Sequence, residues 1–231
     1  KGQKRFWVYG EEIMKKHNYP GLFIAFEGLD GSGSSTQVDI LAKRLSSNGL
    51  HAFATKEPTN NMIGGLIRAA LTKSWSPSPE CLQLLYTADR AHHLQREVVP
   101  ALEKGNIMIT DRYFFSTIAF GSINLDKKWL IEINSKFIIP DITFFVRVSP
   151  KECIKRIGKS RNEFELFEEE KKLAKVLKAY DELAKEDYGF IVVDGEKNIR
   201  QIEEEIYIHV AKKIAKKDGD LRHKEKNLFN L

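Results

Sequence analysis

Cysteine is almost absent from this chain of 231 residues, which contains only Cys81 and Cys153. The two lie far apart and form neither a C-x-x-C motif nor a metal-ligand spacing, so we expect reduced, small hydrophobic side chains. No apolar run approaches the roughly 18–20 residues that a membrane span needs. The basic and aromatic segment that opens the sequence shows no signal-peptide pattern. These absences predict a cytoplasmic protein without a membrane partner.

Charge of one sign does not gather in any long stripe. The chain has 37 Lys and Arg residues against 32 Asp and Glu residues, a formal net charge of +5. This balance permits nucleotides or nucleic acids as partners but specifies neither. The basic segment 216–231 could touch nucleic acid, but chain ends are usually solvated or frayed, and we do not expect a nucleic-acid partner. The length and the 42% of hydrophobic residues fit one sizeable domain with a buried core.

Internal repeats and long linkers are also missing. Five apolar runs predict strands at residues 22–27, 51–55, 106–110, 141–148 and 190–194. Helical periodicity between them predicts helices from about residue 35, from 80 towards 104 with a bend or break at Pro100, from 150, and from 198 to 216. The alternation indicates an α/β fold with a parallel sheet covered on both faces. In such sheets the ligand lies beyond the carboxyl ends of the strands.

A glycine-rich turn follows the first predicted strand. Residues 28–36 read G-L-D-G-S-G-S-S-T, which nearly fits the phosphate-binding pattern G-x-x-x-x-G-K-[ST]. Gly28 and Gly33 stand at the anchoring positions, and Ser35 falls where a hydroxyl group binds Mg²⁺. Ser34 replaces the lysine of the pattern, and loss of one such donor typically costs on the order of 10²–10³ in rate. Taken alone, the segment also fits a strand-to-helix turn with no phosphate role.

Polar residues elsewhere fit phosphate and base binding. Asp111 follows the third strand and can hold Mg²⁺ through water, while the guanidinium of Arg112 can clamp a phosphate. Tyr86 and Arg90 are four residues apart on one helical face, so a ring and a guanidinium could stack on a base and bind its edge. In isolation each pattern also fits a surface ion pair or a core aromatic residue. A positively charged mobile lid is predicted at Arg156, Lys159 and Arg161, with a solvated helix end as the alternative.

Taken together, these segments resemble thymidylate kinase. The matching segments occur in the family's order, at residues 23–37, 55–71, 84–93, 109–120 and 140–150. The resemblance implies a three-layer P-loop NTPase fold with a five-stranded parallel sheet flanked by helices, usually homodimeric. It implies transfer of the γ-phosphoryl group of Mg-ATP to dTMP, giving dTDP for dTTP biosynthesis. We expect an extension at 1–19, a kinase-like domain at 20–216 with a lid at about 156–168, and a basic tail at 217–231.

The resemblance also implies a role for each matching residue. Catalytic residues would be Asp30, Arg112, Lys159 and Arg161. ATP would bind to Gly28, Gly31, Ser32, Gly33, Ser34, Ser35, Thr36 and Arg156. The acceptor would bind to Glu57, Pro58, Arg68, Tyr86, Arg90, Arg112, Tyr113, Ser116 and Thr117. Mg²⁺ would be held by Ser35 and Asp111.

Three positions depart from the family's pattern. Besides Ser34, Lys56 replaces the arginine common before E-P, and Gly121 stands where many bacterial members have glutamine, which would remove one base contact. In the family, a D-G-S-G loop goes with basic lid residues that stabilise the transferring group. Two alternatives stay open: a kinase that acts on dUMP, another monophosphate or a deoxynucleoside, and a catalytically weak nucleotide-binding module.

Overall fold

The computed structural model describes residues 7–8, 11–12, 15–158, 163–186 and 188–228. Its main sheet has five parallel strands in the order β5-β6-β4-β8-β9. The strands are β4 (Leu22–Gly28), β5 (Ala52–Lys56), β6 (Ile107–Asp111), β8 (Ile142–Arg147) and β9 (Phe190–Asp194). All five coincide with the apolar runs of the sequence, so the predicted sheet is confirmed.

Strand β4 forms the centre of the sheet. Leu22 pairs with Ile107 of β6, and Ile24 pairs with Ile142 of β8. Every residue of β4 is buried, because neighbours cover it on both edges and both faces. Since all strands are parallel, their carboxyl ends lie along one edge of the sheet, and the glycine-rich turn after β4 lies in the middle of that edge.

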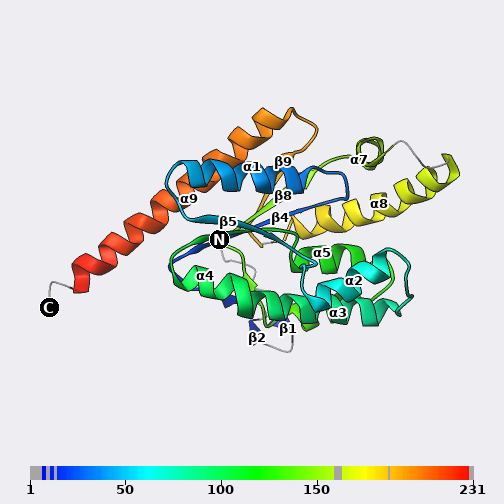
Figure 1. Ribbon diagram of the computed structural model, residues 1–231, viewed down its shortest axis with the longest axis horizontal. Coiled ribbons are helices and arrows are strands. Elements are labelled where there is room, and N and C mark those ends of the chain that lie inside the picture. Colours follow the sequence, from blue (N-terminus) through cyan, green and yellow to red (C-terminus); the bar gives the residue numbers. More distant parts are fainter. Residues whose placement is uncertain (1–6, 9–10, 13–14, 159–162, 187, 229–231) are drawn as a thin grey trace.

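Helices cover both faces of the sheet (Figure 1). Helices α1 (Ser34–Ser47) and α9 (Ile199–Leu228) pack on one face, and α3 (Pro79–His93), α5 (Phe114–Gly121) and α8 (Glu163–Leu183) lie on the other. Neighbouring residues of β8 show the alternation: Phe144 contacts His209 of α9, whereas Phe145 stacks on Tyr180 of α8. The other helices are α2 (Met62–Leu71), α6 (Lys127–Asn134) and α7 (Pro150–Ile157). This arrangement confirms the predicted three-layer α/β fold.

The long helix predicted over residues 80–104 is interrupted rather than uniform. After α3, a π-helical turn η1 (Leu94–Val98) leads into the short helix α4 (Val99–Glu103). Pro100 has no N–H group to donate to the carbonyl group four residues earlier, so the hydrogen-bond register widens just before it. The predicted bend therefore occurs as a π-turn on the amino side of the proline.

Regular secondary structure occurs in both segments that were predicted to flank the kinase-like domain. Strands β1 (Trp7–Val8) and β2 (Glu11–Glu12) form a hairpin, and β3 (Lys15–Lys16) pairs in parallel with β7 (Ile138–Ile139). Asp141 accepts a hydrogen bond from the N–H of Phe23 at 3.0 Å and lies 3.0 Å from Nε2 of His17. Helix α9 continues to Leu228, beyond its predicted end at 216, because residues 221–228 include Leu, Arg, Lys and Glu, which favour helix. The division into three parts remains a prediction.

Both cysteines are free, with Cys153 buried and Cys81 partly buried. Within the ranges that the structure describes, no helix has both the length and the apolar content that crossing a membrane would require.

Candidate active site

The glycine-rich phosphate loop connects β4 to α1 at the carboxyl edge of the sheet. Gly31 and Gly33 have φ angles of +82° and +90°, a left-handed conformation that favours glycine. At Gly28 a Cβ atom would lie 2.9 Å from the carbonyl oxygen of Val146, so the loop packs too closely on β8 for a larger residue. The loop lines a cavity of about 580 Å³, where the first N–H groups of α1 would stabilise an anion.

Asp111 at the end of β6 is joined to the phosphate loop by two hydroxyl groups. Ser34 Oγ donates to Oδ1 at 2.8 Å, and Ser35 Oγ donates to Oδ2. The structure thus brings the predicted metal pair together, and the serine that replaces the loop lysine binds the same carboxylate. A hydroxyl group and a carboxylate beside a cavity fit Mg²⁺, which prefers oxygen ligands and keeps several waters. No cluster of three or more acidic, His or Cys side chains suited to a metal occurs among the described residues.

Arg112 follows β6 and reaches back to the phosphate loop. Its Nη1 donates to the carbonyl oxygen of Gly28 at 2.9 Å and to Ser116 Oγ at 3.0 Å, and its Nη2 donates to Asp30 Oδ1 at 2.7 Å. Burial opposes the charge of this guanidinium, but nearby acidic groups such as Asp30 raise the pKa of Arg112 above its usual range. Its φ of +71° costs roughly 1–2 kcal/mol in a residue with a Cβ. The turn therefore holds a permanent cation beside the loop.

Glu27, the residue before the loop, is fully buried. Its carboxyl group accepts hydrogen bonds from the N–H of Tyr113 at 3.0 Å, from Tyr180 Oη at 2.8 Å and from Ser116 Oγ at 2.5 Å. Burial raises the pKa of Glu27 to about 7, against the opposing effects of the Ser116 hydrogen bond and the Arg112 charge. These bonds fix the start of α5 and thereby the turn that carries Arg112. Sequence analysis missed Glu27, although one acidic residue in an apolar strand was a signal.

On the far side of this turn, Arg90 of α3 is enclosed and only 1% exposed. Its Nη2 lies 2.7 Å from Glu57 Oε2, and its Nε donates to the same oxygen at 2.8 Å. Its Nη1 donates to Asn134 Oδ1 at 2.5 Å, and Nη2 also donates to Thr117 Oγ1 at 3.1 Å. The structure brings together three residues that were predicted for the acceptor pocket. Asn134 was missed, because nothing in the spacing of α6 relates it to α3.

Tyr86 lies on α3 and Arg68 on α2, the helix that packs beside α3. Tyr86 is partly buried, and burial raises the pKa of its hydroxyl to about 12, while the charges of Arg112 and Asp30 also act on it. Arg68 donates a hydrogen bond to the carbonyl oxygen of Thr59, in the segment that follows β5.

Two of the predicted acceptor residues point into the interior. Tyr113 is fully buried, and its hydroxyl donates to the carbonyl oxygen of Ile138 at 3.0 Å. Ser116 uses its hydroxyl on Glu27 and Arg112. The structure therefore does not bring Tyr113 to the nucleotide side of the site. Pro58 is partly buried and follows a cis peptide bond.

Comparison with known proteins identifies the family. The family model described as Thymidylate kinase matches residues 26–206. The chain belongs to the thymidylate kinase family. It is 40% identical over 183 residues to a "Probable thymidylate kinase" of Sulfurisphaera tokodaii, covering 79% of this chain and 92% of that protein. It is 36% identical over 197 residues to the "Thymidylate kinase" of Leifsonia xyli, covering 82% of this chain and 94% of that protein.

A third relative, a "Probable thymidylate kinase" of Thermococcus gammatolerans, is 36% identical over 197 residues, covering 80% of this chain and 94% of that protein. The matched region includes the whole five-stranded sheet except the first residues of β4. Membership of the thymidylate kinase family makes this chain an ATP-dependent kinase, in agreement with the phosphate loop.

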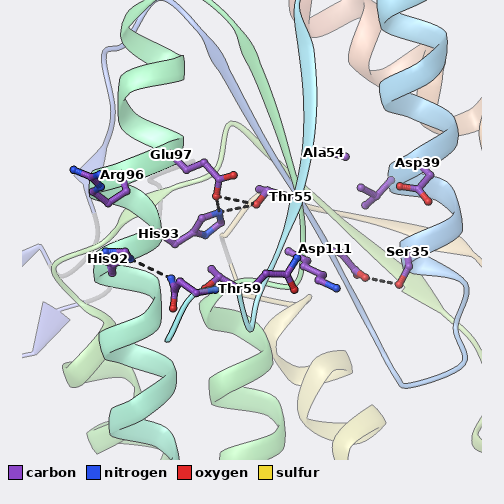
Figure 2. A pocket seen from close by; sticks show the side chains of 14 residues that line it. Ser35, Asp39, Ala54, Thr55, Thr59, His92, His93, Arg96, Glu97 and Asp111 are labelled. Carbon is purple, nitrogen blue, oxygen red and sulfur yellow. Dashed lines mark hydrogen bonds and ion pairs between the residues drawn. The ribbon is translucent and has the colours of Figure 1, made fainter. Parts of the chain in front are cut away.

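A second cavity of about 620 Å³ opens beside the phosphate loop of this thymidylate kinase family member (Figure 2). Ser35 lies at one side, and the buried ring of His93 lies at the other. His93 Nε2 lies 2.8 Å from Thr55 Oγ1 and 3.2 Å from Glu97 Oε2, and its Nδ1 lies 3.1 Å from Glu57 Oε1. The His93 imidazole therefore links Thr55 in the wall of this cavity to Glu57. The carboxylate of Glu57 in turn binds Arg90.

The lid predicted for a thymidylate kinase is described in part. Arg156 of α7 donates to the carbonyl oxygen of Ser32 at 3.3 Å and to that of Gly195 at 3.1 Å. Its guanidinium is therefore attached to the phosphate loop, as an ATP-binding role requires. The other predicted lid residues, which lie outside the described ranges, are Lys159 and Arg161.

Sequence analysis also missed the residues that follow the fifth strand. Gly195 and Lys197 line the cavity around the phosphate loop, together with Ile199 and Ile202 of α9. They follow the carboxyl end of β9, which is where ligands of parallel sheets lie. That position was the available signal, but the segment carries no recognisable motif.

Proposed function

We propose that this protein transfers the γ-phosphoryl group of Mg-ATP to dTMP and forms dTDP, a step of dTTP biosynthesis in the cytoplasm. The observation that carries the proposal is the turn Asp111–Arg112. Its carboxylate binds both loop hydroxyls, and its guanidinium binds Gly28 and Asp30. A phosphate donor and a phosphate acceptor would therefore meet at one turn. The thymidylate kinase names of the relatives support dTMP as the acceptor.

The reaction would proceed by attack of a dTMP phosphate oxygen on the γ-phosphorus of ATP. The bond to the β–γ bridging oxygen would break, and ADP would leave. Such transfer depends on positioning and charge neutralisation more than on covalent chemistry. The loop amides would hold the ATP phosphates, Arg112 would hold the acceptor phosphate, and Asp30 would orient Arg112. Mg²⁺ bound at Ser35 and Asp111 would neutralise charge on the transferring group.

The charge that the loop lysine would carry must come from other parts of the fold. Ser34 is neutral, and its hydroxyl is used on Asp111. We propose that Arg112 and Arg156 replace this charge, together with the lid residues Lys159 and Arg161. The attachment of Arg156 to the carbonyl oxygen of Ser32 supports the proposal, because it holds a guanidinium beside the phosphate cavity.

An Arg156→Ala variant is expected to lower kcat by about 10²-fold, because it removes a preorganised cation from the loop. Lys155→Ala is the matched control. Both side chains bind Glu152, Arg156 at 3.0 Å and Lys155 at 3.2 Å, but the side chain of Lys155 is 78% exposed and that of Arg156 only 32%. A coupled ADP-release assay measures both variants. If Arg156→Ala and Lys155→Ala turn over equally fast, Arg156 does not supply the missing charge.

An acceptor panel tests the proposed function itself. ADP release would be measured with ATP, Mg²⁺ and each of dTMP, dUMP, dCMP and thymidine, and dTMP is expected to give the highest kcat/KM. Asp30→Ala, which removes the partner of Arg112, is the reference for weak background turnover. A higher kcat/KM with dUMP or thymidine would establish the alternative acceptor. Absence of turnover above the Asp30→Ala level with every acceptor would show a nucleotide-binding module.

We also propose a homodimer, the usual state in this family. Large apolar side chains are exposed on α2, α3 and the segment between them, and such surface on adjacent helices fits burial against a second copy. These side chains are Met62, Leu66, Leu71, Trp75 and Leu84. Sedimentation velocity at micromolar concentration would measure the mass, and a monomer there would contradict the proposal.

A further inference from the structure

Gln83 on α3 carries a buried polar atom without a partner. The residue is 7% exposed, and among the described residues its Oε1 atom has no hydrogen-bond donor. The hydroxyl of Thr87, one turn further along the helix, donates to the backbone carbonyl of Gln83 at 2.9 Å and not to the amide. An unpaired buried acceptor costs about 1–3 kcal/mol. A group that carries this cost is a candidate for a contact that a ligand completes.

The helix places Gln83 on the acceptor side of the fold. Gln83 and Arg90 are seven residues apart and share one face of α3, with Tyr86 between them. Helix α3 packs beside α5 (Figure 1), where Arg90 binds Thr117. One turn further along α5 lies Gly121, and a Cβ atom there would be only 3.2 Å from Cδ of Gln83. Gln83 and Arg90 therefore lie on the same seam between the two helices.

Because Gly121 has no side chain, the amide group of Gln83 can occupy the space beside it. A Cβ atom on Gly121 would also lie 2.9 Å from Cδ1 of Leu130, which is fully buried and cannot move away easily. A side chain at position 121 would thus displace the amide. The polar group at this end of the seam comes from α3 because α5 has glycine there.

We propose that the amide of Gln83 binds the edge of the acceptor base and selects a pyrimidine that carries N3–H. The inference rests on the proposed function. The base of dTMP presents an N3–H donor between two carbonyl acceptors. A guanidinium has donors alone, so Arg90 can bind a carbonyl oxygen of the base but cannot accept from N3–H. Oε1 of Gln83 supplies the missing acceptor. The N3 atom of cytosine is itself an acceptor, so dCMP would bind here only if the amide rotated to present Nε2, and this rotation would have to occur in the tightly packed space beside Gly121.

A Gln83→Leu variant tests the inference. The substitution keeps the volume but removes both polar atoms, so kcat/KM for dTMP is expected to fall about 30-fold and the preference for dTMP over dCMP to shrink by a similar factor. The KM for ATP should stay unchanged. Because an unpaired buried oxygen is removed, the Tm should stay the same or rise. The matched control is Gln95→Leu, which changes an exposed glutamine in η1, the helical turn that directly follows α3.

An atomic version of the test uses the N3-methyl derivative of dTMP with the wild type and with Gln83→Ala, which leaves room for the methyl group. Replacing dTMP by its N3-methyl derivative removes the N3–H donor and should lower kcat/KM in both proteins. The decrease should be about tenfold larger in the wild type than in Gln83→Ala, because the variant already lacks the amide that accepts from N3–H. Equal losses, or a Gln83→Leu variant with wild-type kcat/KM and dCMP discrimination, would overturn the inference alone. A wild type inactive with dTMP would overturn the proposed function and this inference together.

Discussion

An Arg112→Ala variant should lose turnover with dTMP by a factor on the order of 10³, because it removes the cation that joins the acceptor side to the phosphate loop. The guanidinium makes three hydrogen bonds, to Gly28, Ser116 and Asp30. The loop has no lysine at position 34, so this fixed charge contributes more to charge neutralisation than it would in a complete loop. Steady-state kcat with saturating ATP and dTMP is the measurement.

Two companion variants make the Arg112 result specific. Arg112→Lys keeps a positive charge but loses the planar fork, so it should recover only part of the lost rate. Arg147→Ala removes a more exposed arginine from β8, where it binds Asp181 at 2.8 Å, and should leave kcat unchanged. Near-wild-type kcat in Arg112→Ala would mean that the acceptor phosphate is held by other groups, and the proposed role of the turn would be wrong.

An Arg90→Met variant is expected to lose about 3–5 kcal/mol of unfolding free energy, because it leaves the carboxylate of Glu57 buried without its cationic partner. The side chains of both residues are almost completely enclosed, at 1% and 2% exposure. Asn134 and Thr117 would lose a donor at the same time. Urea denaturation followed by circular dichroism measures the change through the midpoint at constant m-value.

Two control variants accompany Arg90→Met. Adding Glu57→Gln to Arg90→Met neutralises the orphaned carboxylate, so the double variant should be more stable than Arg90→Met alone. Arg147→Met breaks a more exposed ion pair, with side chains 47% and 33% exposed, and should cost no more than about 1 kcal/mol. A loss below that value in Arg90→Met would show that water or a rearranged side chain satisfies Glu57.

Much of the fold could be predicted from local sequence pattern. The inner strands β6, β4 and β8 were recognisable because both of their faces are buried, which produces a continuous apolar run. The edge strands β5 and β9 are more exposed, but their sequences are also apolar runs. Residues 28–36 were recognisable because glycine spacing, a preceding strand and a following helix act over a short stretch of chain. Tyr86 and Arg90 were correctly placed on one face because helical periodicity alone determines it.

Contacts between distant segments could not be predicted in the same way. Glu27 meets Tyr180 across 153 positions of sequence, and Arg90 meets Asn134 across 44. No local periodicity encodes such pairs, since they depend on how α3, α6 and α8 pack. The same reason explains Tyr113: its place in the D-R-Y motif suggested a substrate contact, but the strained turn at Arg112 directs its ring into the core.

The sequence by itself determined the sheet, the phosphate loop, the absence of a lysine at position 34 and the family resemblance, because each depends on spacing along the chain. The tertiary structure decided what the substituted serine does, since Ser34 meets Asp111 from a strand 77 positions away. It likewise decided that Arg156 reaches the loop and that the amide of Gln83 fills the space beside Gly121. Hydrogen bonds and packing act over a few ångströms in space, and only the folded chain brings those groups within reach.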